Sequence, residues 1–291
     1  MLTQNRERTF QHNYKDRHRI HEILQHNHDH ILVCAHRGDW RNYPENSLEG
    51  IQNALEFGSH IIEIDIQRSA DGVFFLMHDR TLNRTTTGSG LLSELRAENI
   101  EQCRLKNGLN YPTNYKVPRL QEVLELAQRH NCVIYIDKAF PYIDEVYPLL
   151  LSTRTVEQVL IKIPQIPDAK NLIPETRKRY PGPLFLASIN TAQNSVEGYM
   201  DHLIAVEKPD AIELLFSEKT TEIASIFAKK IKQSRIRVFV NTMRTLCGPY
   251  HDENIQQEPH IIQTLAQNGF SIIQTDRPKL ILKHVSDIYY H

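Results

Sequence analysis

Short apolar runs alternate with segments of helical periodicity along most of the chain. The first run, residues 31–35, contains only apolar or small residues and ends abruptly at the polar pair His36 and Arg37. Runs of four to six residues rich in Val, Ile and Leu predict buried β-strands. The pattern recurs seven times, at residues 61–66, 133–136, 158–163, 184–187, 211–215, 236–240 and 271–274.

Amphipathic helical segments fill the intervals between these runs. They are expected at residues 47–57, 120–130, 143–152, 169–179, 220–233 and 259–267. The first has Asn46 as its expected N-cap, with Glu49 three residues later. Eight strands that alternate with helices predict an α/β protein with a single (β/α)8 TIM barrel, and a doubly wound open sheet is the alternative.

A ninth apolar run, residues 73–77, breaks the alternation. Only the short turn at residues 69–72, which contains Asp71 and Gly72, separates it from the second strand. This spacing leaves no room for a crossover helix, so we expect a short antiparallel β-hairpin after the second strand. The expected register sets His78 opposite Glu63.

The bulk properties fit this organisation and restrict the partners. A barrel of about 250 residues accounts for residues 31–291 as one domain, preceded by an N-terminal helical extension over residues 1–30. No apolar run approaches the length of a membrane span and the N-terminus has no apolar leader core, so we expect a cytoplasmic protein without integral membrane association. A net charge of −1 argues against a nucleic-acid partner.

Two weaker signals do not change this picture. The four cysteines are scattered without a CxxC pair or zinc spacing, which indicates reduced thiols. The histidine-rich segment at residues 26–30 lacks partner ligands at helical spacing, so we interpret it as a solvated loop.

Three acidic residues are expected at one rim of the barrel. Glu63 and Asp65 are two positions apart on a strand, so both carboxylates point to the same face. A divalent cation would offset the repulsion between them. Alternatively, the two carboxylates could form ion pairs with Arg or Lys of a neighbouring strand. Asp137 ends the next strand of the barrel and offers a third carboxylate. Hard oxygen ligands favour Mg²⁺ or Ca²⁺ over zinc.

Two histidines and an arginine are expected beside these carboxylates. His36 and Arg37 end the first strand, and His78 follows the hairpin. Near a cation held by carboxylates, two imidazoles can act as general base and general acid, and Arg37 can donate a forked pair of hydrogen bonds to phosphate oxygens. A lone histidine at a strand end is usually structural, but a pair flanking an acidic cluster is typical of catalysis.

The ordered motifs of residues 36–90 resemble those of the glycerophosphodiester phosphodiesterase family. They are HRG at 36–38, PEN at 44–46, ExD at 63–65, DG at 71–72, HD at 78–79 and RTTTGSG at 84–90. Farther along, VPRL at 117–120 is similar to a helix entry of that family, and IIQTDRP at 272–278 to its last strand. The resemblance covers residues 31–282, and an ordered set of this kind is far more specific than any one motif.

The resemblance implies a barrel enzyme that hydrolyses small glycerophosphodiesters to an alcohol and glycerol 3-phosphate. It implies that His36 and His78 form the acid–base pair and that Arg37 holds the phosphate. Glu63, Asp65 and Asp137 would then bind the divalent cation, Mg²⁺ or Ca²⁺. The substrate's own glycerol hydroxyl is implied as the first nucleophile, giving a cyclic phosphate that water opens.

Three further residues follow from comparison with the family pattern. Glu45 of the PEN motif is expected to orient Arg37 or His36, or else only to favour the positive end of the first helix. The family spaces two charged residues by two on its third strand, whereas Asp137 and Lys138 are adjacent, so Lys138 would face away unless the strand ends there. Lys162, at the end of the following strand, is therefore the expected phosphate-binding cation.

Two alternatives to this function remain open from the sequence. A related barrel could act on intact phospholipids, although no basic amphipathic stretch suited to a membrane surface is evident. A non-catalytic phosphate-binding barrel is the alternative from another class, but simple binding does not need both histidines and the acidic cluster.

Overall fold

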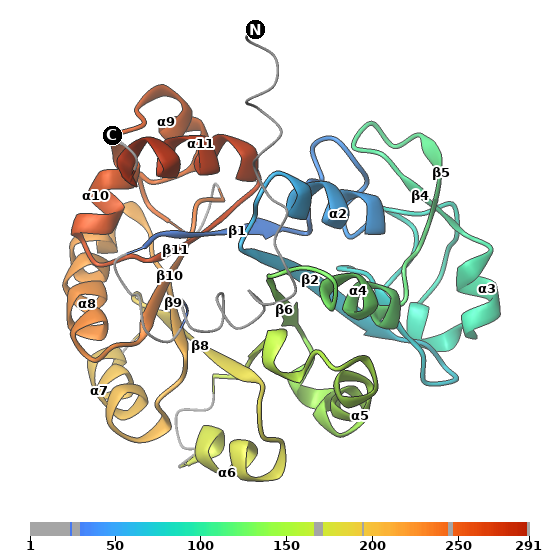
Figure 1. Cartoon of the computed structure of the whole chain (residues 1–291), viewed down its shortest axis with the longest axis horizontal. Coiled ribbons are helices and arrows are strands. Elements are labelled where there is room, and N and C mark those ends of the chain that lie inside the picture. The colour runs from blue at the N-terminus through green and yellow to red at the C-terminus, as the bar shows by residue number, and fades with distance from the viewer. Residues whose placement is uncertain (1–23, 25–29, 166–170, 194, 244–246, 290–291) are drawn as a thin grey trace, which may run out of the picture.

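Eight parallel strands close into a ring in the computed structural model, which describes residues 24, 30–165, 171–193, 195–243 and 247–289 (Figure 1). The strands pair in the order β1, β2, β6, β7, β8, β9, β10 and β11, and β11 returns to β1. The predicted barrel is confirmed, and the open sheet is not formed. The bounds are Leu32–His36, Ile61–Arg68, Val133–Asp137, Val159–Lys162, Leu184–Asn190, Ala211–Leu215, Arg237–Asn241 and Ile272–Thr275, in that order.

The expected hairpin is confirmed, but its register is wrong by one residue. Strand β3 (Phe74–Leu76) pairs antiparallel with β2, and Ile66 lies opposite Leu76. Continuing this register places His78 opposite Ile64 rather than Glu63. Strand β3 also ends before His78, which is therefore carried by a loop rather than by the sheet.

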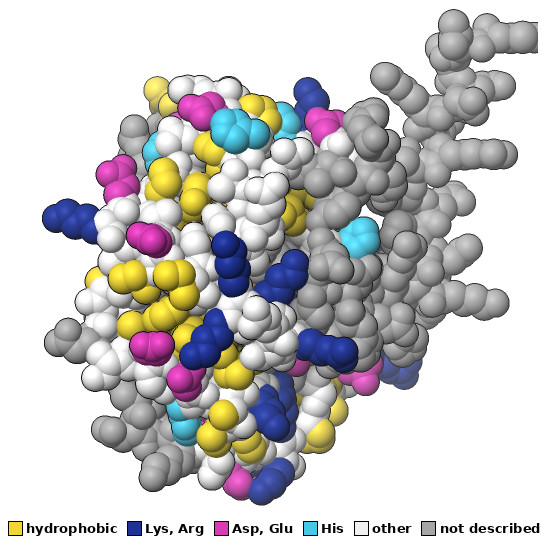
Figure 2. Space-filling view, turned by 90° about the vertical axis from the view of Figure 1, so that its left-hand side faces the viewer, with side chains coloured by type: hydrophobic (Ala, Val, Ile, Leu, Met, Phe, Trp, Pro, Cys, Tyr) yellow, Lys and Arg dark blue, Asp and Glu magenta, His cyan; other side chains and the backbone are white. Residues whose placement is uncertain are grey.

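Helices form the outer layer around the ring (Figure 1). The six predicted helices are present as α2 (Leu48–Glu56), α4 (Leu120–Ala127), α5 (Ile143–Thr153), α6 (Leu172–Arg179), α8 (Thr221–Gln233) and α10 (Ile261–Gln267). The sequence pattern missed α3 (Ala97–Glu101), α7 (Val196–His202), η5 (Leu203–Glu207), α9 (Asp252–Gln257), α11 (Pro278–Tyr289) and the separate antiparallel pair β4 (Arg104–Lys106) and β5 (Pro112–Lys116). Figure 2 shows one outer face of this layer, where charged side chains of both signs lie among apolar ones.

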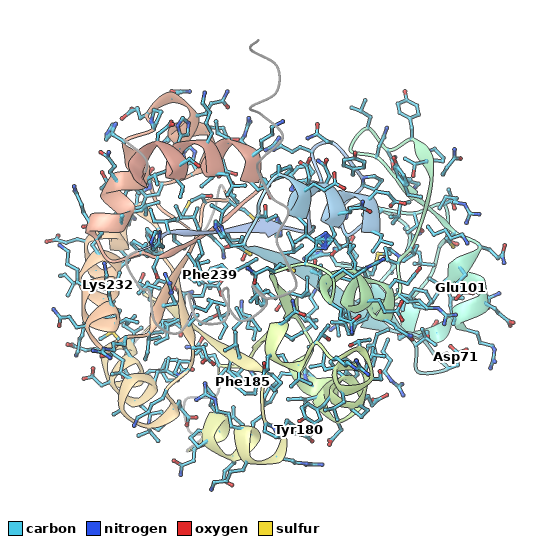
Figure 3. The ribbon with its side chains drawn as sticks, viewed as in Figure 1. Asp71, Glu101, Tyr180, Phe185, Lys232 and Phe239 are labelled. Carbon is cyan, nitrogen blue, oxygen red and sulfur yellow. The ribbon has the colours of Figure 1, made fainter. Side chains whose placement is uncertain are left out.

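Two hydrophobic layers hold the barrel together. The larger lies between the strands and the outer helices, where residues such as Phe185 are buried. The smaller fills the inside of the ring, where the rings of Tyr135 and Phe239 meet edge to face with centroids 5.9 Å apart. Figure 3 shows Phe239 within the ring and Lys232 on the outer surface. The barrel interior is thus a packed core that supports a site at its mouth.

The expected N-terminal extension and the histidine-rich segment fall outside the described residues, except for Leu24 and His30. Leu24 belongs to the hydrophobic layer inside the ring. Its carbonyl accepts a hydrogen bond of 3.2 Å from Nε of the buried Arg237 on β10. Within the described ranges, no helix combines the length and the apolar character needed to cross a bilayer.

Candidate active site

The chain turns sharply where β1 delivers His36 to the mouth of the barrel. Arg37 and Gly38 both have positive φ angles, of 53° and 75°. A Cβ atom at Gly38 would lie only 3.0 Å from backbone atoms of Gly50 and Ile51 in α2, so this position requires glycine. The turn aims the Arg37 backbone N–H at Glu63, whose Oε2 accepts it at 3.0 Å. The sharp turn at the end of the first strand therefore depends on close packing against α2.

His36 is held by a residue from the last strand. Its Nδ1 lies 2.7 Å from Oδ1 of Asp276, which also accepts a 2.7 Å hydrogen bond from Nε1 of Trp40. Burial opposes ionisation of Asp276, but the bonds from His36 and Trp40 hold the pKa of this carboxyl below its ordinary value. Because an ionised carboxylate can only accept, Nδ1 of His36 carries a proton, so that Nε2 is the nitrogen with the lone pair in the neutral form of the ring. Nε2 lies 4.0 Å from Oε2 of Glu63.

Three carboxylates meet beside His36. Glu63 and Asp65 project from β2, and Asp137 lies opposite Asp65 at the end of β6. Ligand oxygens of the three lie within 4.8 Å of one another. Glu63 is 4% exposed, and its pKa is raised well above the usual value, first by burial and then by the charges of Asp65 and Asp137. The metal-free cluster is therefore electrostatically unfavourable, and its all-oxygen donor set fits a hard divalent cation.

Asp65 differs from Glu63 because cations already surround it. Lys138 Nζ donates to its Oδ1 at 2.9 Å, and Arg37 Nε lies 3.2 Å from Oδ2. Despite burial, these two charges hold the pKa of Asp65 below its ordinary value. Lys138 reaches it because β6 ends at Asp137 and Lys138 takes a positive φ of 64°. The strand does end there, so Lys138 points to the site.

Asn46 also contacts Asp65, which corrects its expected role as a helix cap. The N-cap of α2 is Ser47, whose side chain accepts from the Gly50 backbone N–H. Asn46 instead adopts a positive φ of 57°, donates from Nδ2 to Oδ2 of Asp65 and accepts from the Asp65 backbone N–H, both at 3.2 Å. The PEN motif thus fixes the second strand as well as starting the helix.

His78 follows β3 on a loop near Asp65. Its backbone carbonyl accepts a 2.8 Å hydrogen bond from Nζ of Lys138, the ammonium that also binds Asp65. Its Nδ1 lies 2.7 Å from Oδ1 of Asp79, which leaves Nε2 available. The imidazole is 41% exposed, compared with 14% for His36. In both histidines Nδ1 is therefore bonded to an aspartate carboxylate, but His78 is more exposed to solvent than His36.

A chain of ion pairs connects Arg37 to His78. Glu45 accepts from Arg37 Nη1 at 3.0 Å and from both terminal nitrogens of Arg84 at 2.7 and 2.8 Å. Burial disfavours the charged form of Glu45, but the two guanidiniums hold its pKa below the ordinary value. Arg84 continues to Asp79, with Nε 2.7 Å from Oδ2. Of the two expectations for Glu45, contact with Arg37 is the one that the geometry matches.

Lys162 lies apart from this chain of ion pairs. Its Nζ donates to Glu213 on β9 at 2.7 Å, and the same carboxylate accepts from Ser188 at 2.5 Å and Asn241 at 2.6 Å. Burial lowers the pKa of Lys162, but Glu213, together with the charges of Asp137 and Glu63, raises it above the ordinary value overall. The ammonium group of Lys162 is thus bonded to Glu213, and it is near enough to the acidic cluster for Asp137 and Glu63 to raise its pKa.

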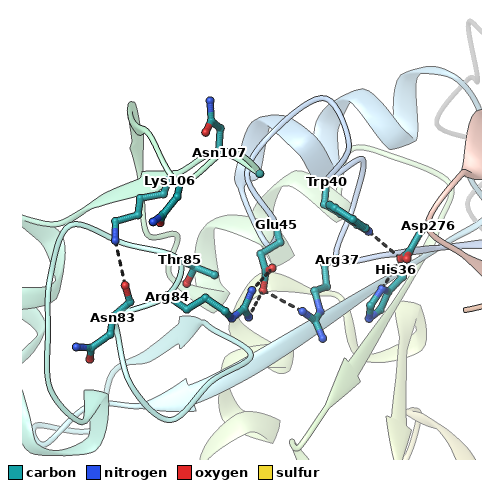
Figure 4. A pocket seen from close by; sticks show the side chains of 12 residues that line it. His36, Arg37, Trp40, Glu45, Asn83, Arg84, Thr85, Lys106, Asn107 and Asp276 are labelled. Atoms are coloured by element: carbon teal, nitrogen blue, oxygen red, sulfur yellow. Dashed lines mark hydrogen bonds and ion pairs between the residues drawn. The ribbon is translucent and has the colours of Figure 1, made fainter. Parts of the chain in front are cut away.

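The expected residues His36, Arg37 and Glu45 line a pocket of about 600 Å³. Figure 4 shows His36 and Asp276 at one end, Asn83 and Lys106 at the other, and Arg37, Glu45 and Arg84 between them. The pocket volume is typical of sites for small organic ligands.

A family model described as the glycerophosphoryl diester phosphodiesterase family matches residues 36–163. Residues 36–163 of this chain are therefore similar to the glycerophosphodiester phosphodiesterase family. A second model, described only as a domain of unknown function, matches residues 185–285.

Relatives with this family name are similar over part of this chain. The human protein glycerophosphodiester phosphodiesterase 1 is 38% identical over 115 residues, which are 38% of this chain and 34% of that protein. A glycerophosphodiester phosphodiesterase of Caldanaerobacter subterraneus is 36% identical over 109 residues, 36% of this chain and 44% of that protein. The chain spans less than half the length of the curated relatives it matches.

Solved structures extend the likeness in fold to the whole barrel. A glycerophosphoryl diester phosphodiesterase from Parabacteroides distasonis aligns with a TM-score of 0.71 at 23% identity, covering 92% of this chain and 91% of its own. An Oleispira antarctica phosphodiesterase, solved in complex with the product sn-glycerol-3-phosphate, aligns with a TM-score of 0.65 at 18% identity, covering 88% and 96%. Both share the (β/α)8 fold of this chain.

Several site residues were not expected from the sequence. Asp276 lies in the TDRP segment that follows the last strand. Because β11 pairs with β1 when the barrel closes, the predicted barrel fold could have indicated that this segment lies near His36. Arg84 opens the RTTTGSG motif at residues 84–90, and no role of Arg84 itself is expected from the sequence. Lys106 belongs to the unexpected pair of strands β4 and β5, for which no pattern gave a signal.

Proposed function

We propose that this chain is a divalent-cation-dependent phosphodiesterase that hydrolyses glycerophosphodiesters to an alcohol and glycerol 3-phosphate. The observation that carries the proposal is the carboxylate-held His36 beside three clustered carboxylates and the guanidinium of Arg37. The match of residues 36–163 to the glycerophosphoryl diester phosphodiesterase family supports the reaction class, and the all-oxygen cluster supports Mg²⁺ or Ca²⁺ as the cofactor.

Glu63, Asp65 and Asp137 would hold the cation. When bound, it supplies positive charge that neutralises the three carboxylates and stabilises negative charge on the phosphate oxygens. Arg37 binds a phosphate oxygen from the neighbouring side, because Glu45 and Asp65 already fix its guanidinium. Lys138 and Lys162 each have a carboxylate partner and contribute positive charge at the rim.

The two histidines carry the protons in this proposal. Nε2 of His36 is the base that accepts the proton of the attacking hydroxyl as its oxygen bonds to phosphorus. The bond from phosphorus to the headgroup oxygen breaks, and Nε2 of His78, in its protonated form, donates a proton to that oxygen. The greater exposure of His78 suits the side from which the alcohol departs.

With the substrate's glycerol hydroxyl as the attacking group, this step gives a cyclic phosphate. Water then opens it: His78 takes a proton from the water as the water oxygen bonds to phosphorus, and His36 returns a proton to the glycerol oxygen that leaves. The sum is addition of one water, with OH on phosphorus and H on the alcohol.

Phosphorus NMR of the purified protein with a panel of glycerophosphodiesters tests this function. Glycerol 3-phosphate should appear with Mg²⁺ or Ca²⁺ and should not appear with chelator. The variants His36→Ala and His78→Ala should each lose at least about 100-fold in turnover. His260→Ala, an exposed histidine paired with Glu258 and absent from the pocket, is the matched control and should keep normal turnover.

Three outcomes would contradict the proposal. Near-normal turnover in either site-histidine variant would overturn the proton roles. Equal turnover with and without chelator would overturn the cation. Phosphodiester binding by calorimetry without any hydrolysis would make the chain a binding protein.

A further inference from the structure

The end of the pocket farthest from His36 is built by parts of the chain that the proposed reaction does not use. The segment 83–85 and the β4–β5 hairpin supply this wall, with Asn83, Lys106 and Asn107 among its residues (Figure 4). His78, the proposed acid for the headgroup oxygen, is connected through Asp79 to Arg84, which lines the pocket next to Asn83. The headgroup of a substrate whose phosphate is bound by Arg37 would therefore extend toward this wall.

The carboxylates of the pocket already have hydrogen-bond or ion-pair partners. Glu45 lies between the guanidiniums of Arg37 and Arg84. Asp276 accepts from His36 and Trp40. Neither carboxylate is therefore free to attract a cationic headgroup.

Lys106 supplies a positive charge at this wall. Its Nζ donates to the backbone carbonyl of Asn83 at 3.0 Å. Across the described ranges of the chain, no carboxylate lies within ion-pair distance of this ammonium. An ammonium bonded only to a carbonyl keeps its full charge and two further hydrogens for a ligand.

The neighbouring amides add donors rather than acceptors. Oδ1 of Asn83 accepts from the Gly90 backbone N–H at 3.1 Å. Oδ1 of Asn107 accepts from the backbone N–H groups of Leu109 and Tyr111, both at 3.0 Å. Since each carbonyl oxygen is engaged with the backbone, the side chains present their NH₂ groups, which can only donate.

The wall also lacks the aromatic faces that recognise quaternary ammonium groups. Trp40 is the one aromatic residue among those that line the pocket in the described structure. Its Nε1 is bound to Asp276, and the Arg41 guanidinium lies over its ring at 4.9 Å from the centroid. Choline-type cations are recognised by stacked aromatic faces, which this arrangement does not offer.

We infer that this wall selects glycerophosphodiesters whose headgroup is rich in acceptors, carrying a carboxylate or several hydroxyls, over those with a quaternary ammonium headgroup. Lys106 is the specificity-determining residue. This inference rests on the proposed function, since it assigns the headgroup side of the same pocket.

Steady-state kinetics on three substrates tests the inference. For the wild-type protein, kcat/KM for glycerophosphoinositol and glycerophosphoserine should exceed that for glycerophosphocholine by about tenfold or more. Lys106→Gln should reduce this ratio by about tenfold, and Lys106→Glu should reverse it by placing a carboxylate where a cation would bind.

Lys116→Gln is the matched control. Lys116 lies on the partner strand β5 of the same hairpin and faces a different surface depression, which Glu101 and Arg119 also line. This variant should keep the wild-type ratio. Circular dichroism and the melting temperature of all three variants establish that the hairpin remains folded.

The outcomes separate this inference from the proposed function. Failure to hydrolyse any glycerophosphodiester contradicts the function itself. Hydrolysis with a preference for glycerophosphocholine overturns only the selectivity. A uniform loss of kcat/KM for all three substrates in Lys106→Gln also overturns it, because the wall would then bind the shared glycerol rather than the headgroup.

Discussion

Nδ1 of His36 lies 2.7 Å from Oδ1 of Asp276, although 240 positions separate the two residues in the sequence. The carboxylate fixes both the orientation of the imidazole and the nitrogen that carries its proton. Trp40 binds the same oxygen and prevents the carboxylate from rotating freely. Asp276 is therefore a positioning residue for the proposed base.

We expect Asp276→Asn to lower kcat by about 10²- to 10⁴-fold with little change in KM, because an amide can present its NH₂ group to Nδ1 and favour the wrong tautomer. The pH profile of kcat should shift as well, which a merely structural change would not produce. Asp201→Asn, at an exposed aspartate of α7 paired with Lys230, is the control. A kcat within twofold of wild type in Asp276→Asn would contradict this role.

The acidic cluster predicts a variant that gains stability while it loses activity. Burial and the neighbouring carboxylates raise the pKa of Glu63, so a carboxyl group at this position is less favourable in the metal-free folded protein than in the unfolded chain. Glu63→Gln removes this carboxyl group and keeps an oxygen that can accept from the Arg37 N–H. We expect the free energy of unfolding in chelator to rise by about 1 kcal/mol while turnover is lost.

The same variant tests cation binding by denaturation with and without Mg²⁺ or Ca²⁺. A cation at about 100 times its dissociation constant should stabilise the wild-type protein by about 2.7 kcal/mol, and Glu63→Gln by much less. Glu222→Gln, at an exposed position of α8, should behave like the wild-type protein in both conditions. If Glu63→Gln is less stable than the wild-type protein in chelator, the Glu63 carboxyl group does not destabilise the metal-free protein.

The bidentate contacts of Arg84 predict a sensitivity to a conservative change. Lysine keeps the charge but cannot bond to both oxygens of Glu45 and to Asp79 at once. We expect Arg84→Lys to lower kcat/KM by about tenfold, because both Arg37 and His78 lose a fixed neighbour. Arg96→Lys, at a 66% exposed arginine near Asp71 and Glu98, should have no measurable effect in the same assay.

His60 predicts a loss of stability in mild acid. Its Nδ1 accepts a hydrogen bond from the Val33 backbone N–H, which requires the neutral ring. Burial, followed by the charges of Arg237 and His30, lowers the pKa of His60 from 6.5 to about 4. The unfolded chain therefore binds the proton first. The stabilisation is complete above pH 6.5 and is lost as the pH falls toward 4.

Chemical denaturation between pH 7 and pH 4 measures this effect. We expect His60 to account for a loss of about 2 kcal/mol, less than a fully buried group would give, since part of the ring is accessible. His60→Gln, which keeps an acceptor for Val33, should show a correspondingly flatter pH dependence. An unchanged slope would show that His60 has the same pKa in the folded and the unfolded protein, which would contradict the lowering of its pKa by burial.

The strands were predictable because each one carries its own local signal. Buried parallel strands need a continuous apolar run, and strand 211–215 is found with the bounds that its composition predicts. The β4–β5 pair had no such signal, because β5 alternates between exposed and half-exposed residues and begins with Pro112. Helix α7 contains Gly198 and only seven residues, too short for its periodicity to stand out.

The sequence could predict contacts in the site only where the local backbone determines which way a side chain points. Glu63 and Asp65 share a face because side chains alternate along a strand. Lys138 would have faced away had β6 continued, and a positive φ at that one residue turns its side chain to Asp65. The contact between His36 and Asp276 depends on ring closure, which no local spacing encodes.

This contact between the first and last strands makes the two halves of the molecule inseparable. The segment that matches the family model ends at residue 163 and contains all the site residues expected from the sequence, yet the partner of His36 lies 113 residues beyond its end. An amino-terminal half expressed alone would lack the carboxylate that sets the tautomer of its base. During synthesis, a nascent chain would likewise remain inactive until its final strand had left the ribosome and docked against β1.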